Sequence, residues 1–417
     1  MKINNIYKVS KLYTLILLLL VSIFLSSCNS FAKNQAKSET STSETTTIDH
    51  NDAEITHILV SNIPIHEEPK YNGVYIKKTF DEFNAFGFEY GDSVDIVFSN
   101  GYELTDIPYF SGFYTAVGDP LLVAYPGYEY IDACIYNGDG LWSVGNFEPN
   151  DTATISLHEK GKYLSRETLL KVKYTDDRND YASDEIFTNF RNVKTGNLKK
   201  NILYRGASPI DNQHNRARYA DDLIEKSHVK YDVNLSDTVK DITDHFNSDD
   251  FDSDYFKSLY EEGKVSITPL KMNYKSEEFA RMIVKAMTDM SKNEGPYYIH
   301  CLEGKDRTGF LCMIIEGLTG ASYEEIIKDY MASYDNYYQV NENNNKEKYD
   351  TIKENNINAM LRFLADNDPN AGNGDIELED LDWVNITGRY LERNGMTEED
   401  INNFYIRLTD ENYHDPD

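Results

Sequence analysis

The ten residues from His300 to Gly309, with the sequence HCLEGKDRTG, constrain the structure of this chain more than any other segment. Cys301 stands six positions before Arg307, and a hydroxyl residue, Thr308, follows the arginine directly. The residues between such a cysteine and arginine can curl around one tetrahedral dianion and direct successive backbone N–H groups at its oxygens. The guanidinium completes the cradle, because its planar fork matches two phosphoryl oxygens. The spacing therefore predicts a phosphate-binding loop with a thiol at its base.

The flanks of this loop have the pattern of a strand followed by a helix. Residues 296–300 are rich in aromatic and β-branched side chains, which predicts a short strand. Residues 309–318 are almost entirely apolar, which predicts a buried helix. A helix N-terminus beside the loop would stabilise both a bound phosphate and a thiolate, and would lower the pKa of Cys301. The alternative is an inert buried cysteine, which the glycine, arginine and threonine at their spacings make the weaker interpretation.

This segment resembles the loop of the cysteine-dependent protein tyrosine phosphatase superfamily, in the bacterial branch that reads His-Cys-x-x-Gly-Lys-Asp-Arg-Thr-Gly. Three further segments resemble that branch: residues 203–209 (LYRGASP), 232–237 (DVNLSD) and 320–330 (GASYEEIIKDY). The resemblance covers residues 200–410, and the loop is its most specific part. It implies a phosphatase domain in the C-terminal half of the chain.

The resemblance implies a role for each loop residue. Cys301 would attack phosphorus to form a phosphocysteine, while Arg307 and the loop amides stabilise the transition-state charge. Thr308 would hydrogen-bond the sulfur when it leaves, and His300 would order the loop and favour the thiolate. No metal or other cofactor is expected. The loop residues expected to bind substrate are Leu302, Glu303, Gly304 and Lys305.

The general acid cannot come from the segment that supplies it in classical members. Classical members carry an Asp on a mobile Trp-Pro-Asp loop, but the corresponding residues 265–274 contain no carboxylate. Asp306, inside the loop, is the expected acid, with Glu303 and Asp237 as alternatives. Asp306 could equally be a structural partner of backbone N–H groups or of Lys305.

Two cations bear on the substrate. A lysine at the position of Lys305 also occurs in phosphoinositide and dual-specificity phosphatases, where it suits a second phosphate, although a solvated surface lysine is the commoner situation. Arg205 is expected to be a further substrate contact, or else a salt-bridge partner. A phosphotyrosine, a phospholipid headgroup and an inositol phosphate therefore all remain open as substrates.

The N-terminus predicts the location of the protein. Residues 1–27 have a basic start and an apolar run at 15–25, and the run is too short to favour a single-pass membrane anchor. The sequence LSSC at 25–28 is typical of a lipoprotein cleavage site, which predicts removal of residues 1–27 and acylation of Cys28 with palmitate-type chains. Residues 28–50 would be a flexible tether. We therefore expect the protein on the extracytoplasmic face of a cell membrane.

The net charge limits which molecules the protein can bind, and the positions of the cysteines indicate whether it contains a disulfide. The formal net charge is −30, which argues against nucleic acid as a partner because phosphate contacts require a basic patch. The expected partners are a phosphorylated protein or a small phosphomonoester, and the membrane through Cys28. Cys301 must stay reduced to react, and Cys134 and Cys312 fall in different parts of the chain, so no structural disulfide is expected.

The chain length allows two domains after the tether. Residues 52–160 contain short alternating strands with Gly and Asn turns, near 54–60, 71–77, 93–98, 121–125 and 130–136, which predicts a small β-barrel. Residues 161–198 form a connector. Residues 199–417 alternate strand and helix, with strands near 230–235, 265–270 and 296–300 and helices near 254–262 and 276–292, which predicts an α/β phosphatase domain with a mostly parallel sheet flanked by helices. Apolar periodicity predicts further helices at 324–337, 346–365 and 397–408.

Three functions follow from different readings of these features. The favoured one is an active phosphatase, acting on phosphotyrosine or a related monoester, with a phosphoinositide or inositol phosphate phosphatase as its variant. The second is a surface lipoprotein that binds phosphorylated ligands without turnover. The third is an interaction protein in which residues 52–160 carry the role.

Two acidic strings, 250–261 and 366–377, resemble calcium loops but lack glycine at the turn, and are expected to be acidic surface loops.

Overall fold

The computed structural model describes residues 58–371 and 377–410. The predicted signal peptide, the tether and Cys28 lie outside the described residues, so the lipid anchor stays a prediction. Within the described part of the chain, the structure contains no helix with the length and apolar character needed to cross a membrane.

The N-terminal part is a closed barrel of seven strands in the order β1-β2-β6-β5-β4-β3-β7. Neighbouring strands are antiparallel except for β4 and β5, which run parallel. Closure of the barrel leaves no unpaired sheet edge. This confirms the predicted small β-barrel. The strands are β1 (Leu59–Glu67), β2 (Val74–Ile76), β3 (Ser93–Phe98), β4 (Glu103–Phe110), β5 (Pro120–Val123), β6 (Ile131–Ile135) and β7 (Thr152–Glu159).

Side chains along β6 alternate between two apolar clusters. Ile131 and Ala133 belong to the main barrel core, whereas Cys134 packs in a second cluster. Asp132 is 2% exposed, and its Oδ1 atom has no hydrogen-bond partner among the described residues. Because burial penalises the charged form, the pKa of Asp132 is raised to about 8.

The C-terminal part is built on a five-stranded sheet in the order β11-β10-β12-β9-β8. The pairs β10–β11, β10–β12 and β12–β9 are parallel, and β8 lies antiparallel at one edge. All residues of β9, β10 and β12 are buried, as expected for strands covered on both faces. The strands are β8 (Arg191–Asn192), β9 (Leu203–Gly206), β10 (Tyr231–Asn234), β11 (Val265–Ile267) and β12 (Tyr297–His300).

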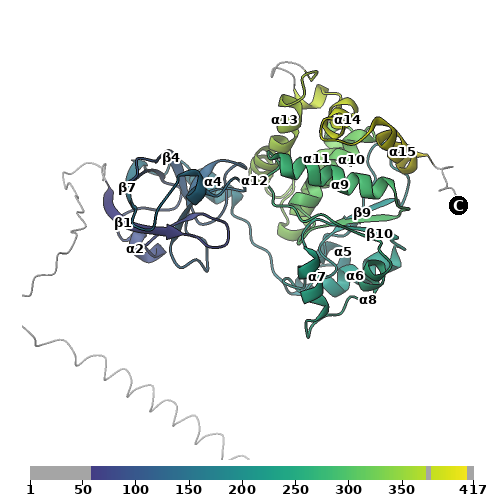
Figure 1. Cartoon of the computed structure of the whole chain (residues 1–417), viewed down its shortest axis with the longest axis horizontal. Helices are drawn as coiled ribbons and strands as arrows, with labels where there is room; N and C mark the ends of the chain where they lie inside the picture. The colour runs from purple at the N-terminus through teal and green to yellow at the C-terminus, as the bar shows by residue number, and fades with distance from the viewer. Residues whose placement is uncertain (1–57, 372–376, 411–417) are drawn as a thin grey trace, which may run out of the picture. The chain divides into compact units, whose positions relative to one another are not determined.

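Helices cover both faces of this sheet (Figure 1). One face carries α5 (Asp184–Phe187), α6 (Ala217–Lys226), α7 (Val239–Phe246) and α8 (Asp254–Glu261). The other carries α9 (Glu277–Ser291), α10 (Asp306–Leu318), α11 (Tyr323–Tyr338), α13 (Ala359–Asp366), α14 (Trp383–Arg393) and α15 (Glu398–Thr409). A π-helical turn, Glu354–Asn358, joins α13 to α12 (Lys346–Lys353). The mixed α/β domain with helices is confirmed.

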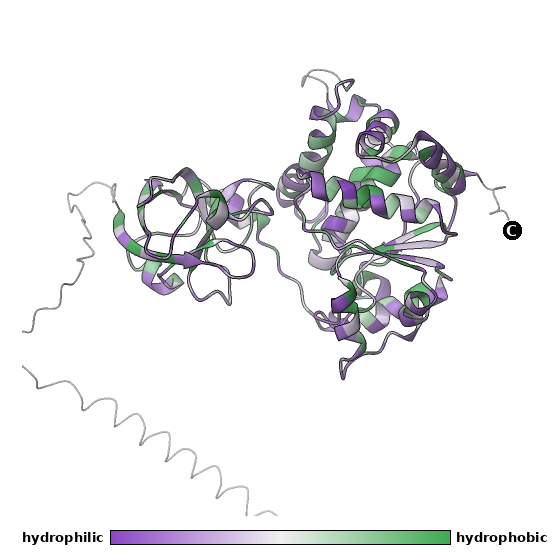
Figure 2. Ribbon diagram, in the orientation of Figure 1, coloured by the Kyte–Doolittle hydropathy of each residue, from purple (hydrophilic) through white to green (hydrophobic). Residues whose placement is uncertain are grey.

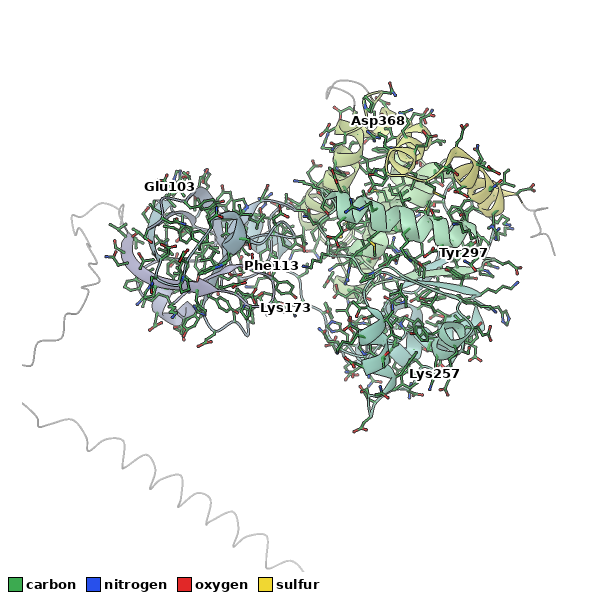
Figure 3. The ribbon with its side chains drawn as sticks, in the orientation of Figure 1. Glu103, Phe113, Lys173, Lys257, Tyr297 and Asp368 are labelled. Carbon is green, nitrogen blue, oxygen red and sulfur yellow. The ribbon has the colours of Figure 1, made fainter. Side chains whose placement is uncertain are left out.

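Helix α10 is the most apolar of these elements and lies at the centre of its layer (Figure 2). Every residue from Thr308 to Leu318 is buried. Tyr297, at the start of β12, also lies in the interior (Figure 3), where its hydroxyl donates to the carbonyl of Asn293 (2.6 Å). The segment between β12 and α10 therefore has rigid, buried supports at both ends.

Candidate active site

The loop HCLEGKDRTG lies between β12, which ends at His300, and α10, which begins at Asp306. Backbone hydrogen bonds tie it to segments that follow both neighbouring strands. The N–H of Leu235, just after β10, donates to the carbonyl of His300 (3.0 Å), and the N–H of Ser208, just after β9, donates to the carbonyl of Leu302 (3.1 Å). The loop thus lies at the carboxyl edge of parallel strands, where α/β proteins commonly bind ligands.

Gly304 is required by the path of the loop. Its φ of +66° lies in the left-handed region, and a Cβ atom added there would be 2.1 Å from the carbonyl oxygen of Gly206. No side chain could be accommodated without moving β9 or the loop. The close approach of the two backbones explains why glycine occupies this position.

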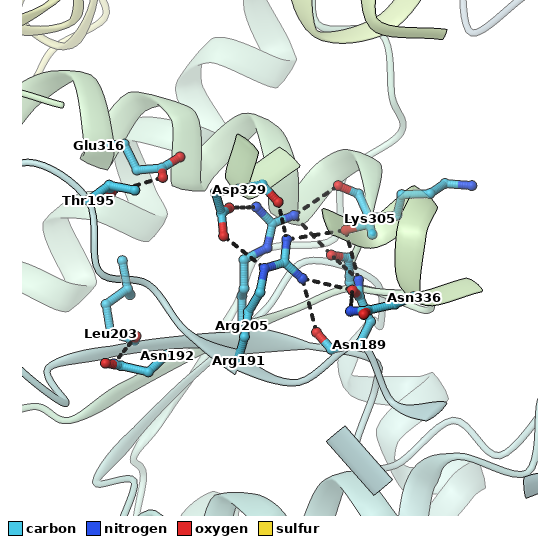
Figure 4. A network of polar contacts seen from close by, with 12 residues as sticks. Asn189, Arg191, Asn192, Thr195, Leu203, Arg205, Lys305, Glu316, Asp329 and Asn336 are labelled. Carbon is cyan, nitrogen blue, oxygen red and sulfur yellow. Dashed lines mark hydrogen bonds and ion pairs between the residues drawn. The ribbon is translucent and has the colours of Figure 1, made fainter. Parts of the chain in front are cut away.

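Side chains hold the loop carbonyls from the outside (Figure 4). Within the described residues, the backbone N–H groups of residues 302–305 donate to no protein acceptor. With the carbonyls fixed outward, these N–H groups are available to an anion at the centre of the loop. The outer bonds run from Tyr337 Oη to Glu303 O (2.8 Å), from Asn189 Nδ2 to Gly304 O (3.1 Å), and from Arg205 Nη2 to Gly304 O (3.0 Å) and Lys305 O (3.1 Å).

Arg205 lies behind the loop, with no exposed surface. Its Nη1 atom is 2.5 Å from Asp329 Oδ2, and Asp329 also binds Arg191 through Oδ1 (2.8 Å) (Figure 4). The position of Arg205 favours the ion-pair role over the expected substrate contact. Glu316 also lies near this cluster: burial raises its pKa well above the usual range, against the opposing effect of the Thr195 hydroxyl, which donates to Oε1 (2.9 Å).

Cys301 lies at the base of the loop and is 3% exposed. Burial opposes ionisation of its thiol, but the nearby Arg307 guanidinium and hydrogen bonding from Thr308 outweigh burial and lower the pKa of Cys301. The buried Thr308 hydroxyl has no hydrogen-bond partner among the described residues and lies near enough to the sulfur to favour the thiolate. By contrast, burial raises the pKa of Cys312, on α10, to about 12.

Arg307 reaches from the first turn of α10 toward the ends of two strands. Its Nη1 atom donates to the carbonyls of Leu270 (3.2 Å) and Leu235 (3.4 Å). The two loop carboxylates, Glu303 and Asp306, pair with Lys305 instead. These contacts fix one edge of the guanidinium and leave its other donors for a phosphoryl group.

His300 is fully buried on the last position of β12. Its Nε2 atom lies 3.1 Å from Oδ1 of Asp232, on the neighbouring strand β10. Burial lowers the pKa of His300, but the charge of Asp232 outweighs it and raises the pKa overall. A positive imidazole beside Cys301 would favour the thiolate.

The three carboxylates considered as general acid have different surroundings. Asp306 is 40% exposed, and its Oδ1 accepts from the Tyr330 hydroxyl (2.9 Å). Glu303 and Asp237 are both held ionised despite burial: Lys305 lowers the pKa of Glu303 to about 2, and hydrogen bonds from His245 and Asn234 lower that of Asp237. A carboxylate held ionised is a poor proton donor, so the surroundings favour Asp306.

The remaining expected substrate-binding residues lie in the loop, in partial contact with solvent. Leu302, Glu303 and Lys305 are all half-buried. Lys305 contacts Glu303 and Tyr338, with Nζ 3.2 Å from Glu303 Oε2 and 3.0 Å from the tyrosine hydroxyl. Its side chain is therefore paired within the protein.

One cluster among the described residues offers metal-ligand atoms: Asp211, Asp237 and His245, whose ligand atoms lie within 4.8 Å of one another. The Asp237 carboxylate is already engaged by Asn234 (2.9 Å) and by His245 (3.6 Å). Internal pairing thus accounts for this cluster, and we assign it no part in the reaction.

The two acidic strings do not have the backbone of a calcium loop where the structure describes them. Residues 254–261 of the first string form α8, and a continuous helix cannot wrap around an ion. Asp368, of the second, lies just after α13 (Figure 3) and is bound by Arg389, with an Nη2 to Oδ2 distance of 2.6 Å.

Residues 212–410 match the model of the tyrosine phosphatase family. Together with the loop geometry, the match supports a tyrosine phosphatase-like domain in this part of the chain, and hence a phosphatase of the hydrolase class. No curated protein matches the chain.

Sequence reasoning missed the side chains that support the loop from outside: Asn189, Asp329 and Tyr337. Asn189 falls in the predicted connector, and the other two fall on a helix that was assigned by its apolar pattern. No spacing rule links such distant positions to the loop. The segment of residues 203–209 was the available signal, because its resemblance pointed to Arg205.

Proposed function

We propose that this protein is a phosphatase that hydrolyses phosphate monoesters, phosphotyrosine or a related ester, through a phosphocysteine intermediate. The observation that carries the proposal is a loop whose carbonyls at Glu303, Gly304 and Lys305 are held from outside, with Cys301 at its base and the pKa of that thiol lowered by Arg307 and Thr308. A thiolate nucleophile and an anion-binding cradle are then in place at the same point.

In the first step, the Cys301 sulfur forms a bond to phosphorus while the bond from phosphorus to the ester oxygen breaks. Loop N–H groups and Arg307 hold the three equatorial oxygens. Asp306 donates a proton to the leaving alkoxide or phenoxide.

In the second step, water attacks phosphorus and gives its proton to the Asp306 carboxylate. The bond from sulfur to phosphorus breaks, which releases inorganic phosphate and restores the thiolate. The Thr308 hydroxyl stabilises the sulfur as negative charge returns to it. His300, paired with Asp232, maintains a positive field beside the sulfur.

The test is hydrolysis of p-nitrophenyl phosphate by the fragment from residue 50 onward, with chelator and reductant present, beside the variant Cys301→Ser. Turnover that disappears in the variant supports the phosphocysteine route. Absence of turnover above the variant would overturn it and leave a protein that binds phosphorylated ligands. Turnover that survives the substitution would place the active site elsewhere.

We further propose that the protein is anchored on the extracytoplasmic face of a cell membrane by acyl chains on Cys28. The support is the sequence LSSC after a short apolar run. Incorporation of labelled palmitate into the full chain, lost in Cys28→Ala, is the expected result. Equal labelling of both forms, or none, would contradict it.

A further inference from the structure

The ammonium group of Lys305 is paired within the protein. Its Nζ atom donates a hydrogen bond to the Tyr338 hydroxyl (3.0 Å) and forms ion pairs with Glu303, 3.2 Å from Oε2, and with Asp306, 3.8 Å from Oδ2. An ammonium has three donors, and three acceptor groups of the protein surround it here. The rings of Tyr334 and Tyr338 also flank it, with centroids at 5.4 and 5.3 Å.

This pairing keeps Lys305 away from solvent, since its side chain is 12% exposed. Burial opposes the charge, but Asp306 and Glu303 outweigh burial and hold the pKa of Lys305 well above its usual range. To bind an anion outside the loop, Lys305 would have to exchange a carboxylate partner for it. That exchange removes most of the gain that a free lysine would bring.

Glu303 keeps its charge in a polar environment. Lys305 and the Tyr174 hydroxyl favour the ionised form of its carboxylate. The Tyr174 hydroxyl lies 3.2 Å from Nε2 of His214, whose Nδ1 lies 3.1 Å from Asp176. These polar groups keep a charged Glu303 carboxylate beside Lys305.

We propose that Glu303 is a specificity-determining residue, which occupies Lys305 and so restricts the site to esters that carry a single phosphate group. This inference rests on the proposed phosphatase function. The two loop cations, Lys305 and Arg307, are balanced by two loop carboxylates, Glu303 and Asp306. A second phosphate beside the loop would meet no net positive charge, whereas a single phosphate is bound by Arg307 and the backbone. The substrate class is therefore singly phosphorylated esters such as phosphotyrosine, rather than bisphosphorylated inositols.

The experiment compares kcat/KM for phosphotyrosine with that for a soluble inositol bisphosphate, using the wild-type chain and Glu303→Gln. The amide keeps the shape of the side chain and removes its charge, so Lys305 becomes available. The ratio of inositol bisphosphate to phosphotyrosine activity should rise about tenfold, the effect of one new charge-assisted contact. The double variant Glu303→Gln, Lys305→Met should lose this gain.

Glu324→Gln is the matched control, because it removes one negative charge from an exposed position on α11. Its ratio should equal that of the wild type. Tyr174→Phe, which removes a hydroxyl that favours the charged form of Glu303, should shift the ratio in the same direction as Glu303→Gln but less. This second variant keeps the test valid if Glu303→Gln folds poorly.

An activity ratio that is unchanged in both Glu303→Gln and Tyr174→Phe would overturn the inference. So would equal hydrolysis of the two substrates by the wild type, if the Lys305→Met variant then lost the activity on inositol bisphosphate. Activity on p-nitrophenyl phosphate separates this outcome from failure of the proposed function. If neither substrate is hydrolysed, calorimetry measures the affinities for inositol bisphosphate and for inorganic phosphate. The ratio of these two affinities should be about tenfold higher in Glu303→Gln than in the wild type. Equal relative binding would overturn the inference in that case too.

Discussion

The guanidinium of Arg205 and the carboxylate of Asp329 form a buried ion pair, with 2.5 Å between Nη1 and Oδ2, on the outer side of the loop between β12 and α10. Arg205 reaches the loop carbonyls of Gly304 and Lys305 with its other amino group. Asp329 thus acts on the loop through Arg205, which makes both of them positioning residues.

Asp329→Asn should therefore lower both stability and activity. The substitution leaves the buried Arg205 and the half-buried Arg191 without a full counter-charge, and loss of one partner of a buried pair typically costs about 3–5 kcal/mol. Chemical denaturation measures the change in unfolding free energy. The control is Asp335→Asn, which changes an exposed carboxylate on the same helix. A loss no larger than that of the control would show that the pair does not stabilise the fold.

Gly304→Ala should abolish most of the activity, because the added Cβ would overlap the carbonyl of Gly206 and strain a backbone at positive φ. We expect kcat/KM for p-nitrophenyl phosphate to fall by at least about 100-fold, the effect of a small displacement of catalytic groups. Gly388→Ala, on α14, is the comparison, since a Cβ there meets nothing within 4 Å. That variant should keep full activity and gain about 0.5–1 kcal/mol of stability. Equal activity of the two variants would contradict the steric argument.

The Cys301 thiol should titrate below 9.0, the usual value for the group, because Arg307 and Thr308 favour the thiolate. As pH falls through the lowered pKa, the thiolate becomes protonated and kcat/KM should decrease. Arg307→Met should raise the midpoint most, and Thr308→Val should raise it less. The ultraviolet absorbance of the thiolate gives the midpoint directly, with Cys301→Ser as the blank. A midpoint that does not move in Arg307→Met would contradict the assigned cause.

Asp306→Asn should slow the enzyme most where the leaving group needs a proton. A general acid contributes about 10²–10⁴-fold, so phosphotyrosine hydrolysis should fall by about that factor. Hydrolysis of p-nitrophenyl phosphate should fall less, because its leaving group is stable as an anion. Asp237→Asn is the control for loss of a nearby carboxylate. If both substrates slowed equally in Asp306→Asn, the residue would hold the loop rather than donate the proton.

Asp132 should make the barrel less stable as pH rises. The pKa of its side chain is about 8 in the folded protein and near 3.8 otherwise. Between these values the folded state binds the proton and the unfolded state does not, so stability decreases with pH through this window and levels off above it. Asp132→Asn should remove the decrease and be more stable above about pH 8, by a few kcal/mol. Thermal denaturation at several pH values measures this, and parallel curves for the two proteins would contradict it.

Much of the fold could be predicted from local pattern. Residues 93–98 are a strand as predicted. The predicted helix 254–262 exceeds α8 by one residue at its C-terminal end, and the predicted helix 276–292 exceeds α9 by one residue at each end. Most of the predicted strand at 54–60 lies outside the described residues, and its last two residues belong to β1, which continues to Glu67. Strands β4 and β7 were not predicted. Pro108 hides the strand pattern of β4, because proline is uncommon within strands. In β7 (Thr152–Glu159) the alternation is present in the sequence and was overlooked, with Ala153 and Ile155 in the core.

The helical C-terminal region was harder. The predicted helix 346–365 is divided by a π-helical turn at Glu354–Asn358 into α12 and α13, and apolar periodicity does not reveal such a turn. Helix α14 was not predicted, although Asp382 caps it by accepting from the N–H of Asn385 (3.1 Å).

The candidate site, too, could be predicted from the sequence only in part. The loop residues follow one another in the chain, so their spacing was sufficient to predict the cradle. Its outer supports come together through tertiary packing, and the pairing of Lys305 with Glu303 depends on side-chain direction. The spacing of residues therefore could not show whether Lys305 is free to bind a second phosphate.

The side chains that hold the loop carbonyls have a practical consequence for fragments of this protein. The family match begins at residue 212, yet Asn189 and Arg205 lie before that point. A fragment cut at the start of the match would keep Cys301, Arg307 and Thr308 but lose these two supports. In such a fragment the loop carbonyls would lack two of the side chains that hold them, so the loop would not have its shape before substrate binds. An expressed domain should therefore begin upstream of Asn189, and weak activity in a shorter fragment would reflect the cut rather than the chemistry of the enzyme.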